Sequence, residues 1–368
     1  MKLNHIYKSI ACGVLLAMTA TSCDLDYNPV DTYSDVTEGV NKTDEKPIFN
    51  SVQDVETSMV TLHKKFRDQQ EHWYVDKLLI GDAHSDNAYA GTTGAEVVPY
   101  ETNSIEGSNS VLKRDWDRFL GDIAVANRII VGCDQLKALS ESERGKYQSQ
   151  AKIFRAMVMF DMVRLWGNFP VITTVGGDIT EDNVEEMYPT YFPPQNTAEE
   201  AYAQIEKDLT EAVENPNTPT NDTSDKSILT KSVARAMLAK VYAEKPLRDY
   251  AKVIKYADEL AADGFDLVED FSDLWAYDTE KKDCRVRNTK EAILEAHFPP
   301  GSGNWCTWMF GRNLSNWDES FTWAKWITPS RDLIRLYEEQ GDTKRYNESV
   351  VWLSLIHISE PTRPISIS

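Results

Sequence analysis

Cysteine and histidine are scarce in this chain of 368 residues, with five and six copies respectively. No two cysteines have the Cys-x-x-Cys spacing, and no Cys/His cluster has the spacing of a zinc site, so we expect no metal centre and no cofactor. Beyond Cys12 and Cys23, the body of the chain holds only Cys133, Cys284 and Cys306. One disulfide can form among these three, and the sequence does not select the pair.

Basic side chains are also in deficit, because 39 Lys and Arg stand against 59 Asp and Glu, a formal net charge of −20. Binding of nucleic acid requires a basic footprint, whereas this surface repels phosphates. A hydrophobic share of 41% and a charged share of 27% are ordinary for a folded domain. The composition therefore predicts a folded protein that does not bind nucleic acid.

Motifs of catalysis are missing as well: there is no GxSxG elbow, HExxH helix, P-loop or dinucleotide-binding GxGxxG. Glycoside hydrolysis needs two carboxylates at a defined separation, and no local motif marks such a pair. Adjacent acids such as Glu185 and Glu186 are expected in so acidic a chain, where they form solvated faces. We therefore predict no catalytic residues and expect that the protein is not an enzyme.

The first 22 residues have the layout of a secretory leader, in which Lys2 and Lys8 accompany an apolar run that is too short to span a bilayer. Small residues then lead into Cys23 and resemble the lipobox of bacterial lipoproteins, where the cysteine becomes the acylated first residue. The alternative is ordinary signal cleavage beside an unpaired cysteine. We expect a signal peptide over residues 1–22, lipidation of Cys23 and a lipid-anchored linker over residues 23–49.

Loss of this leader, which holds two lysines and no acid, would take the net charge from −20 to −22. Such a surface repels anionic lipid, so attachment to a membrane must come from acyl chains, of which stable anchoring needs two. At the other end, residues 354–368 have no continuity with the preceding sequence and resemble translated adapter read-through. The alternative is a genuine tail. We expect a helical domain over residues 50–353 that is incomplete at its C-terminal end.

Helix signals recur along the body of the chain. Three capping boxes are expected to begin helices, namely Ser51 with Asp54, Ser140 with Glu143, and Thr197 with Glu200. Apolar residues at helical spacing follow each box and also occupy positions 112–130, and a further helix begins near Thr230. The helix after Ser140 is expected to run to about Trp166 and to be buried over residues 156–163, where it is apolar nearly all round.

Paired helices are indicated near residue 240. Leu238, Ala239, Tyr242 and Ala251 match positions of a tetratricopeptide repeat, and the small residues Ala239 and Ala251 would let two helices approach closely. Farther along, residues 291–298 read as a short strand. Thr328 and Pro329 read as the N-cap and first turn of a helix that ends at Gly341.

Several stretches, taken in order, resemble the SusD/RagB family of surface nutrient-binding lipoproteins of Bacteroidota. They are WDRFLGDIAVANRII, AKIFRAMVMFDMVRLWGNFPVIT, AEEAYAQIEKDLTEAV, TKSVARAMLAKVYA, KEAILEAHF and TPSRDLIRLYEEQGDTKRY. The resemblance implies a mainly α fold of stacked tetratricopeptide-like helix pairs with a loop-rich second half. It also implies an outer-membrane, surface-exposed location and a SusC-like TonB-dependent transporter as partner. Asp24 and Asp26 resemble the acidic signal that sends such lipoproteins to the cell surface.

A cluster of tryptophans is the most telling feature for function, since five of the ten lie in one stretch of 22 residues that is rich in Gly, Asn and Ser. A flat aromatic ring stacks on the C–H face of a sugar, while amide groups bond its hydroxyls. The predicted ligand-binding residues here are Trp305, Trp308, Asn313 and Trp317. The alternative is that some of these rings hold loops to the helical body, which we expect of Trp323 and Trp326.

A second set of ligand-binding residues is implied by the resemblance, because ligand contacts in that family come partly from an early loop. The matching positions are Asp86, Asn87, Tyr89 and Tyr100. The alternative for Asp86 and Asn87 is a structural turn or helix cap. The predicted function is capture of oligosaccharides for delivery to the transporter, with peptides or another nutrient as the alternative ligand. A surface glycosidase and a scaffold that binds only protein are further alternatives.

Overall fold

The computed structural model describes residues 47–90, 96–177, 179, 183–244, 246–274, 277–278, 280, 283–298 and 327–350. The chain divides into two units, Met1–Lys46 and Pro47–Ser368, and every described residue lies in the second. The predicted signal peptide, Cys23 and the tail over residues 354–368 lie outside the described residues and stay predictions.

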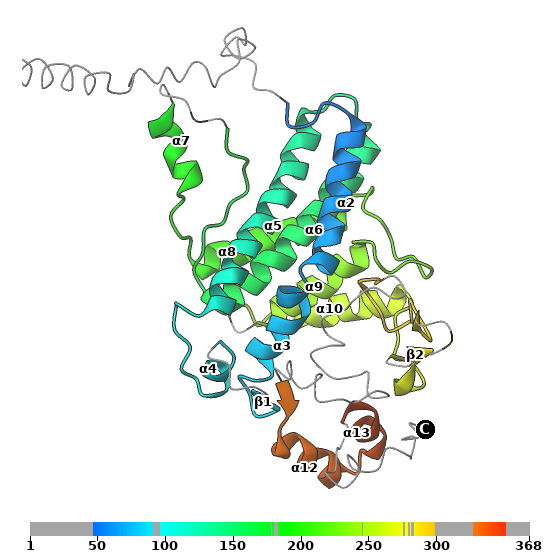
Figure 1. Cartoon of the computed structure of the whole chain (residues 1–368). Helices are drawn as coiled ribbons and strands as arrows, with labels where there is room; N and C mark the ends of the chain where they lie inside the picture. The colour runs from blue at the N-terminus through cyan, green and yellow to red at the C-terminus, as the bar shows by residue number, and fades with distance from the viewer. Residues whose placement is uncertain are drawn as a thin grey trace, which may run out of the picture. The chain divides into compact units, whose positions relative to one another are not determined.

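Helices dominate the described residues (Figure 1). The α-helices are α2 (Val52–Asp68), α3 (Asp76–Gly81), α4 (Val98–Glu101), α5 (Ser110–Gln135), α6 (Glu141–Trp166), α7 (Val184–Tyr191), α8 (Ala198–Glu214), α9 (Lys231–Ala243), α10 (Tyr250–Ala262), α12 (Arg331–Gln340) and α13 (Thr343–Ser349). A π-helix, η2 (Glu71–Val75), precedes α3, and a 3₁₀ turn, η3 (Phe271–Leu274), follows α10.

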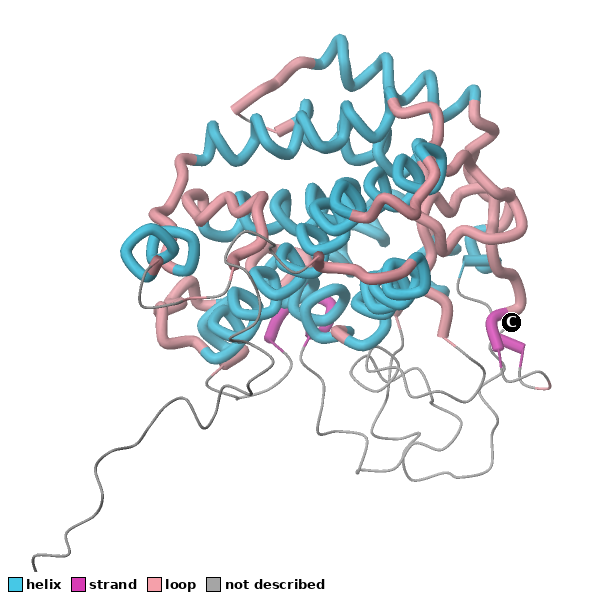
Figure 2. Tube along the Cα trace, turned by 90° about the horizontal axis from the view of Figure 1, so that it is seen from above, coloured by secondary structure: helices cyan, strands magenta, loops and turns pink. Residues whose placement is uncertain are grey.

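Strands are few and short, as the magenta segments of Figure 2 show. They are β1 (Ala88–Ala90), β2 (Tyr277–Asp278), β3 (Asp283–Cys284) and β4 (Ile327–Pro329). β1 pairs with β4 and β2 pairs with β3, both antiparallel. The predicted mainly α fold is confirmed, and among the described residues no helix is both long and apolar enough to cross a bilayer.

Consecutive helices pack against one another, from α5 on α6 through α8 and α9 to α10, with α2 packed against α5. Figure 1 shows α2, α5 and α6 side by side. All three predicted capping boxes form. At α2, for example, the Asp54 N–H donates to Ser51 Oγ at 3.3 Å and Asp54 Oδ2 accepts from the Ser51 N–H at 2.9 Å. Such caps satisfy backbone donors that a helix start leaves unpaired, so they set where each helix begins.

The centre of the core is α6, as its sequence predicts. Six of the eight residues over 156–163 are buried, and their neighbours in the core come from α2, α5, α8 and α9. α6 ends at Gly167, whose φ of +72° lies in the left-handed region that favours glycine. Between α9 and α10 the contact differs in detail from the prediction. Ala251 is exposed, whereas Tyr256 is buried and its ring stacks on Tyr242 at 6.1 Å.

One charged side chain lies inside this core. Arg155 of α6 is 4% exposed and makes two hydrogen bonds to the carboxylate of Asp208 in α8, at 2.8 and 2.6 Å. Its third bond, at 2.7 Å, goes to Asn127 Oδ1 in α5. The Asn127 amide in turn donates to the carbonyls of Ile172 and Thr174. This network joins three helices and the segment that follows α6.

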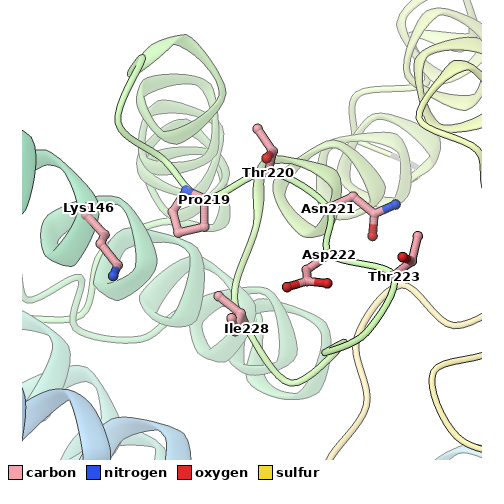
Figure 3. A pocket seen from close by; sticks show the side chains of 7 residues that line it. All are labelled: Lys146, Pro219, Thr220, Asn221, Asp222, Thr223 and Ile228. Carbon is pink, nitrogen blue, oxygen red and sulfur yellow. The ribbon is translucent and has the colours of Figure 1, made fainter.

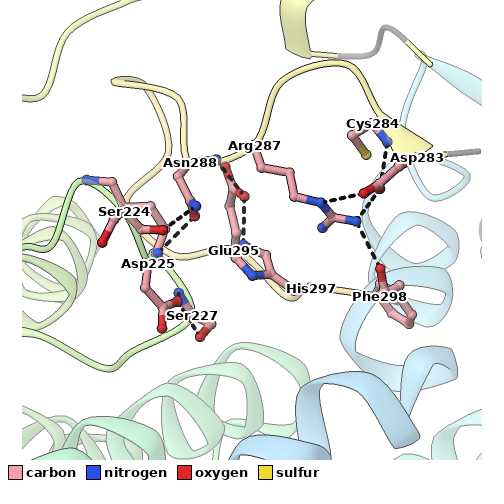
Figure 4. A network of polar contacts seen from close by, with 11 residues as sticks. Ser224, Asp225, Ser227, Asp283, Cys284, Arg287, Asn288, Glu295, His297 and Phe298 are labelled. Carbon is pink, nitrogen blue, oxygen red and sulfur yellow. Dashed lines mark hydrogen bonds and ion pairs between the residues drawn. The ribbon is translucent and has the colours of Figure 1, made fainter. Parts of the chain in front are cut away.

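The predicted strand over residues 291–298 is wrong, because this segment pairs with no strand in the described structure. Its single ladder-like bond runs from the Glu295 N–H to the Lys226 carbonyl, at 2.9 Å. Side chains make the other links, and Figure 4 shows Asn288 reaching Ser224 and Glu295. Ile293, Leu294 and Ala296 pack on the helical core. The apolar run therefore anchors a loop to the core.

Candidate functional site

The β1–β4 pair brings together two segments that are far apart in the chain. Ala88 lies opposite Pro329, Tyr89 opposite Thr328, and Ala90 opposite Ile327. We refer to residues 88–90 and 327–329 as the seam. It joins the early loop, which holds Asp86, Asn87 and Tyr89, to the segment directly after the tryptophan-rich stretch.

Ser330 follows the seam and is 1% exposed. Its N–H donates to the carbonyl of Asn87 at 2.9 Å, and its Oγ donates to the carbonyl of Asp86. The same Oγ accepts from the Leu333 N–H at 3.0 Å, so Ser330 is the N-cap of α12. The prediction that Thr328 is the N-cap and Pro329 the first turn is wrong, because pairing with β1 keeps both residues extended. The predicted helix end at Gly341 is confirmed by a left-handed φ of +66°.

A small apolar cluster packs against the seam. It contains the buried residues Leu79, Ala83, Val97, Tyr100 and Val111, with Ala90 and Ile327 of the seam packed against it. Tyr100 is 0% exposed, and its hydroxyl donates to Asn109 Oδ1 at 3.3 Å. Burial raises the pKa of the Tyr100 phenol. As a residue of this core, Tyr100 cannot contact a ligand directly, which corrects its place in the predicted ligand-binding set.

Tyr89 remains at the surface, 38% exposed. Its hydroxyl accepts from the Arg331 N–H at 3.4 Å, at the start of α12. The neighbouring residue Ala90 donates its N–H to Glu101 Oε2 at 2.7 Å, so the end of β1 is also held by α4. These contacts fix an aromatic ring at the edge of the seam, where part of its surface is open to solvent.

Asp86 and Asn87 occupy the turn before β1, and both residues are exposed. Beside them lies a hollow of about 190 Å³ between this turn and α12. Its lining is Asp86, Asn87, Asp332, Leu333, Arg335, Leu336 and Glu339. Within the described part of the chain, neither the Asp86 carboxylate nor the Asn87 amide has a hydrogen bond or ion pair, so both can serve a ligand. They lie in a turn, as the structural alternative predicted, but their side chains cap no helix there.

Carboxylates outnumber cations around this hollow. Arg335 is paired with Asp332 at 2.8 Å and with Glu339 at 3.5 Å, so its charge is already balanced. Asp86 adds a further negative charge. Leu333 and Leu336 contribute apolar surface, and Leu336 is 46% exposed. The hollow therefore combines hydrogen-bonding groups, apolar surface and a net negative charge.

The other predicted ligand-binding residues, Trp305, Trp308, Asn313 and Trp317, lie outside the described residues and stay predictions. Their stretch is nevertheless tied to the seam by the covalent chain, since Trp326 is bonded to Ile327, and adjacent Cα atoms are about 3.8 Å apart. Sequence analysis missed Ser330 and the α12 residues of the hollow. The signal that could have found Ser330 is its position three residues before Leu333, at the start of an amphipathic helix.

A second and larger hollow, of about 450 Å³, lies beside the loop after α8 (Figure 3). Its polar lining includes Lys146, Thr220, Asn221 and Asp222. Two of these groups already bond within the loop: Asp222 Oδ1 accepts from the Ser224 N–H and hydroxyl, and Asn221 Oδ1 accepts from the Lys226 ammonium. Within the described chain, no aromatic side chain lines either hollow, but the exposed ring of Tyr89 is held next to the seam hollow by its bond to the start of α12. We therefore place the candidate site at the seam.

Among the described residues, three aspartates have a raised pKa, and none of them lines the seam hollow: the half-buried Asp82, whose pKa is raised by burial, and Asp115 and Asp122. Burial raises the pKa of Asp122 to about 6, and burial together with the neighbouring Asp76 raises that of Asp115. Both side chains are inside the core, 0% and 1% exposed, where a substrate cannot reach them. Cys133 and Cys284 are free thiols, so they are not paired with each other. Cys306 lies outside the described residues.

Comparison with known proteins identifies relatives of this chain. Residues 32–243 match the family model SusD-like, described as starch-binding associating with outer membrane. A SusD-like protein of Bacteroides ovatus is 25% identical over 309 residues, which cover 80% of this chain and 50% of that protein.

Solved structures share the fold. A laminarin-binding SusD-like protein has a TM-score of 0.52 and 20% identity, covering 62% of this chain and 48% of that chain. Surface glycan-binding protein A from Bacteroides thetaiotaomicron, in complex with laminarihexaose, has a TM-score of 0.51 and 16% identity, covering 61% and 46%. The chain thus spans about half the length of the proteins it matches.

Proposed function

We propose that this chain, which belongs to the SusD-like family, is a non-catalytic protein that binds oligosaccharides at the seam. The family description names starch binding and association with the outer membrane. Two proteins of similar fold are named for binding laminarin or glycan. These names support a glycan as the ligand class of this chain.

The observation that carries the proposal is the pairing of β1 with β4. It places the exposed side chains of Asp86, Asn87 and Tyr89 beside α12, and Ile327 of β4 directly follows the tryptophan-rich stretch in sequence. A pyranose ring has apolar C–H faces and polar edges, so it suits an aromatic ring accompanied by carboxylate and amide groups. We propose that Asp86, Asn87 and Tyr89 act on one ligand together with the tryptophan-rich stretch.

The charge of the hollow favours an uncharged ligand. Asp86, Asp332 and Glu339 line it, against the single and already paired Arg335. A uronate or sulfate group placed there would meet like charges, which repel it more strongly at low ionic strength. We therefore propose neutral oligosaccharides as the ligand class.

Replacing Asp86 or Asn87 by alanine is expected to weaken binding of a neutral oligosaccharide about fivefold, since one hydrogen bond contributes about 1 kcal/mol. Neither side chain has a described protein partner, so the thermal midpoint should not change. Calorimetric titration against α-glucan, β-glucan, mannan and xylan oligosaccharides, with laminarihexaose among them, measures the effect.

Asp258→Ala is the matched control, because Asp258 is also an exposed aspartate but lies on α10. It should leave affinity unchanged. Equal affinities for the wild type, the Asp86 and Asn87 variants and this control would place the binding surface elsewhere. Turnover of any oligosaccharide by the purified wild type would contradict the non-catalytic role.

We propose further that Cys23 is acylated and anchors the protein on the cell surface, where it passes its ligand to a SusC-like TonB-dependent transporter. The apolar leader is too short to span a bilayer and the acidic body repels anionic lipid, so attachment to a membrane would come from acyl chains on Cys23. Cys23→Ala should release the protein from the membrane fraction of cells that lack the transporter. Full retention of this variant in that fraction would contradict the lipid anchor.

A further inference from the structure

Ser330 makes hydrogen bonds to both sides of the candidate site. Through its N–H and its Oγ it bonds the carbonyls of Asn87 and Asp86, the two residues whose side chains face the hollow. Through the same Oγ it accepts from Leu333 and so begins α12, which forms the other wall. The side chain does not line the hollow, and the residue is 1% exposed.

We propose that Ser330 is a positioning residue for ligand binding, which sets the spacing between the turn at Asp86 and α12 without touching the ligand. This inference rests on the proposed function of the seam. The two partner carbonyls are about 240 positions from Ser330 in sequence. In the described part of the chain, the other hydrogen bonds across this junction are the bond from the Arg331 N–H to the Tyr89 hydroxyl and the short ladder between β1 and β4.

The two hydrogen bonds of the Ser330 Oγ can be tested separately, because the hydroxyl is the donor in one and the acceptor in the other. As a hydroxyl it donates one hydrogen, to the Asp86 carbonyl, and accepts another, from the Leu333 N–H. An aspartate at this position can accept from Leu333 and cap the helix, but when ionised it has no hydrogen to donate. An asparagine has nearly the same size and offers both an acceptor and a donor. The Asp and Asn variants therefore differ in the bond to Asp86, whereas both keep the cap.

The test compares Ser330→Ala, Ser330→Asp and Ser330→Asn by two measurements at a temperature where every variant is folded. The first is amide hydrogen exchange over residues 86–90 without ligand. The second is titration with the neutral oligosaccharide that the wild type binds most tightly. Ser330→Ala and Ser330→Asp should exchange faster over residues 86–90 and bind about fivefold more weakly, the value of about one hydrogen bond. Ser330→Asn should lie closer to the wild type in both.

Ser140→Ala is the matched control for loss of a cap, because Ser140 is the serine N-cap of α6 and has no contact with the seam. It should lower stability in the same way as Ser330→Ala but leave exchange over residues 86–90 and affinity unchanged. A Ser330→Ala variant with wild-type exchange, or with faster exchange and wild-type affinity, overturns the positioning role. If the wild type binds no oligosaccharide, the proposed function fails, and the exchange measurement alone still decides whether Ser330 holds the turn.

Discussion

Replacing Arg155 by alanine is expected to lower the free energy of unfolding by about 3–5 kcal/mol, the usual cost of removing one partner from a buried ion pair. The variant would leave the Asp208 carboxylate, 1% exposed, without the two hydrogen bonds that balance its charge. It would also leave Asn127 Oδ1 without its donor. Because three helices meet at this network, the loss should appear as a lower urea midpoint with an unchanged slope.

Two controls separate this effect from a general loss of charge. Lys113→Ala removes an exposed pair with Asp117 and should cost less than about 1 kcal/mol. Arg155→Met combined with Asp208→Leu removes both buried charges, so it should be much less destabilising than Arg155→Ala alone. An Arg155→Ala midpoint equal to that of Lys113→Ala would show that the buried pair contributes little to the fold.

The helical part of the fold was predictable because its signals are local. Ser51, Ser140 and Thr197 each begin a helix through bonds that span three residues, and the helical spacing of apolar residues marks the faces that become buried. The mainly α class and the buried stretch of α6 follow from these patterns. Resemblance to a known family supplied the stacking of helix pairs.

Contacts between distant segments were not predictable in the same way. Thr328 and Pro329 have the local pattern of a helix start, but pairing with Tyr89 and Ala88 holds them in a strand. Residues 291–298 have the composition of a strand but find no strand to pair with. Tyr100 lies between apolar residues 97–99 and polar residues 101–104, and only the packing of the small cluster shows that it is buried. Each outcome depends on a partner far away in the chain.

Replacing Trp305 or Trp308 by alanine is expected to weaken oligosaccharide binding about tenfold or somewhat more, since stacking of one aromatic ring contributes about 1–2 kcal/mol. The two rings are three residues apart in a glycine-flanked stretch, which suits a platform open to solvent better than a core. Stability should change little. Titration and thermal melts of each variant measure the two effects separately.

Trp73→Ala should show the opposite pattern. Trp73 is 5% exposed and packs against Phe66 and Phe154 at centroid distances of 4.8 and 5.8 Å. Its loss should cost about 3–5 kcal/mol of stability, whereas the folded fraction should keep its affinity. If Trp305→Ala and Trp308→Ala instead unfold the protein, or bind as tightly as the wild type, these rings hold loops in place and do not form the platform.

The most direct test of binding at the seam is amide hydrogen exchange of the wild type with and without a saturating neutral oligosaccharide. Binding at the hollow beside the seam should slow exchange over residues 82–90 and over the first turns of α12, because a ligand there excludes water from both walls. Exchange over residues 219–228, beside the larger hollow of Figure 3, should not change. Slower exchange at residues 219–228 together with unchanged exchange at the seam would contradict the account.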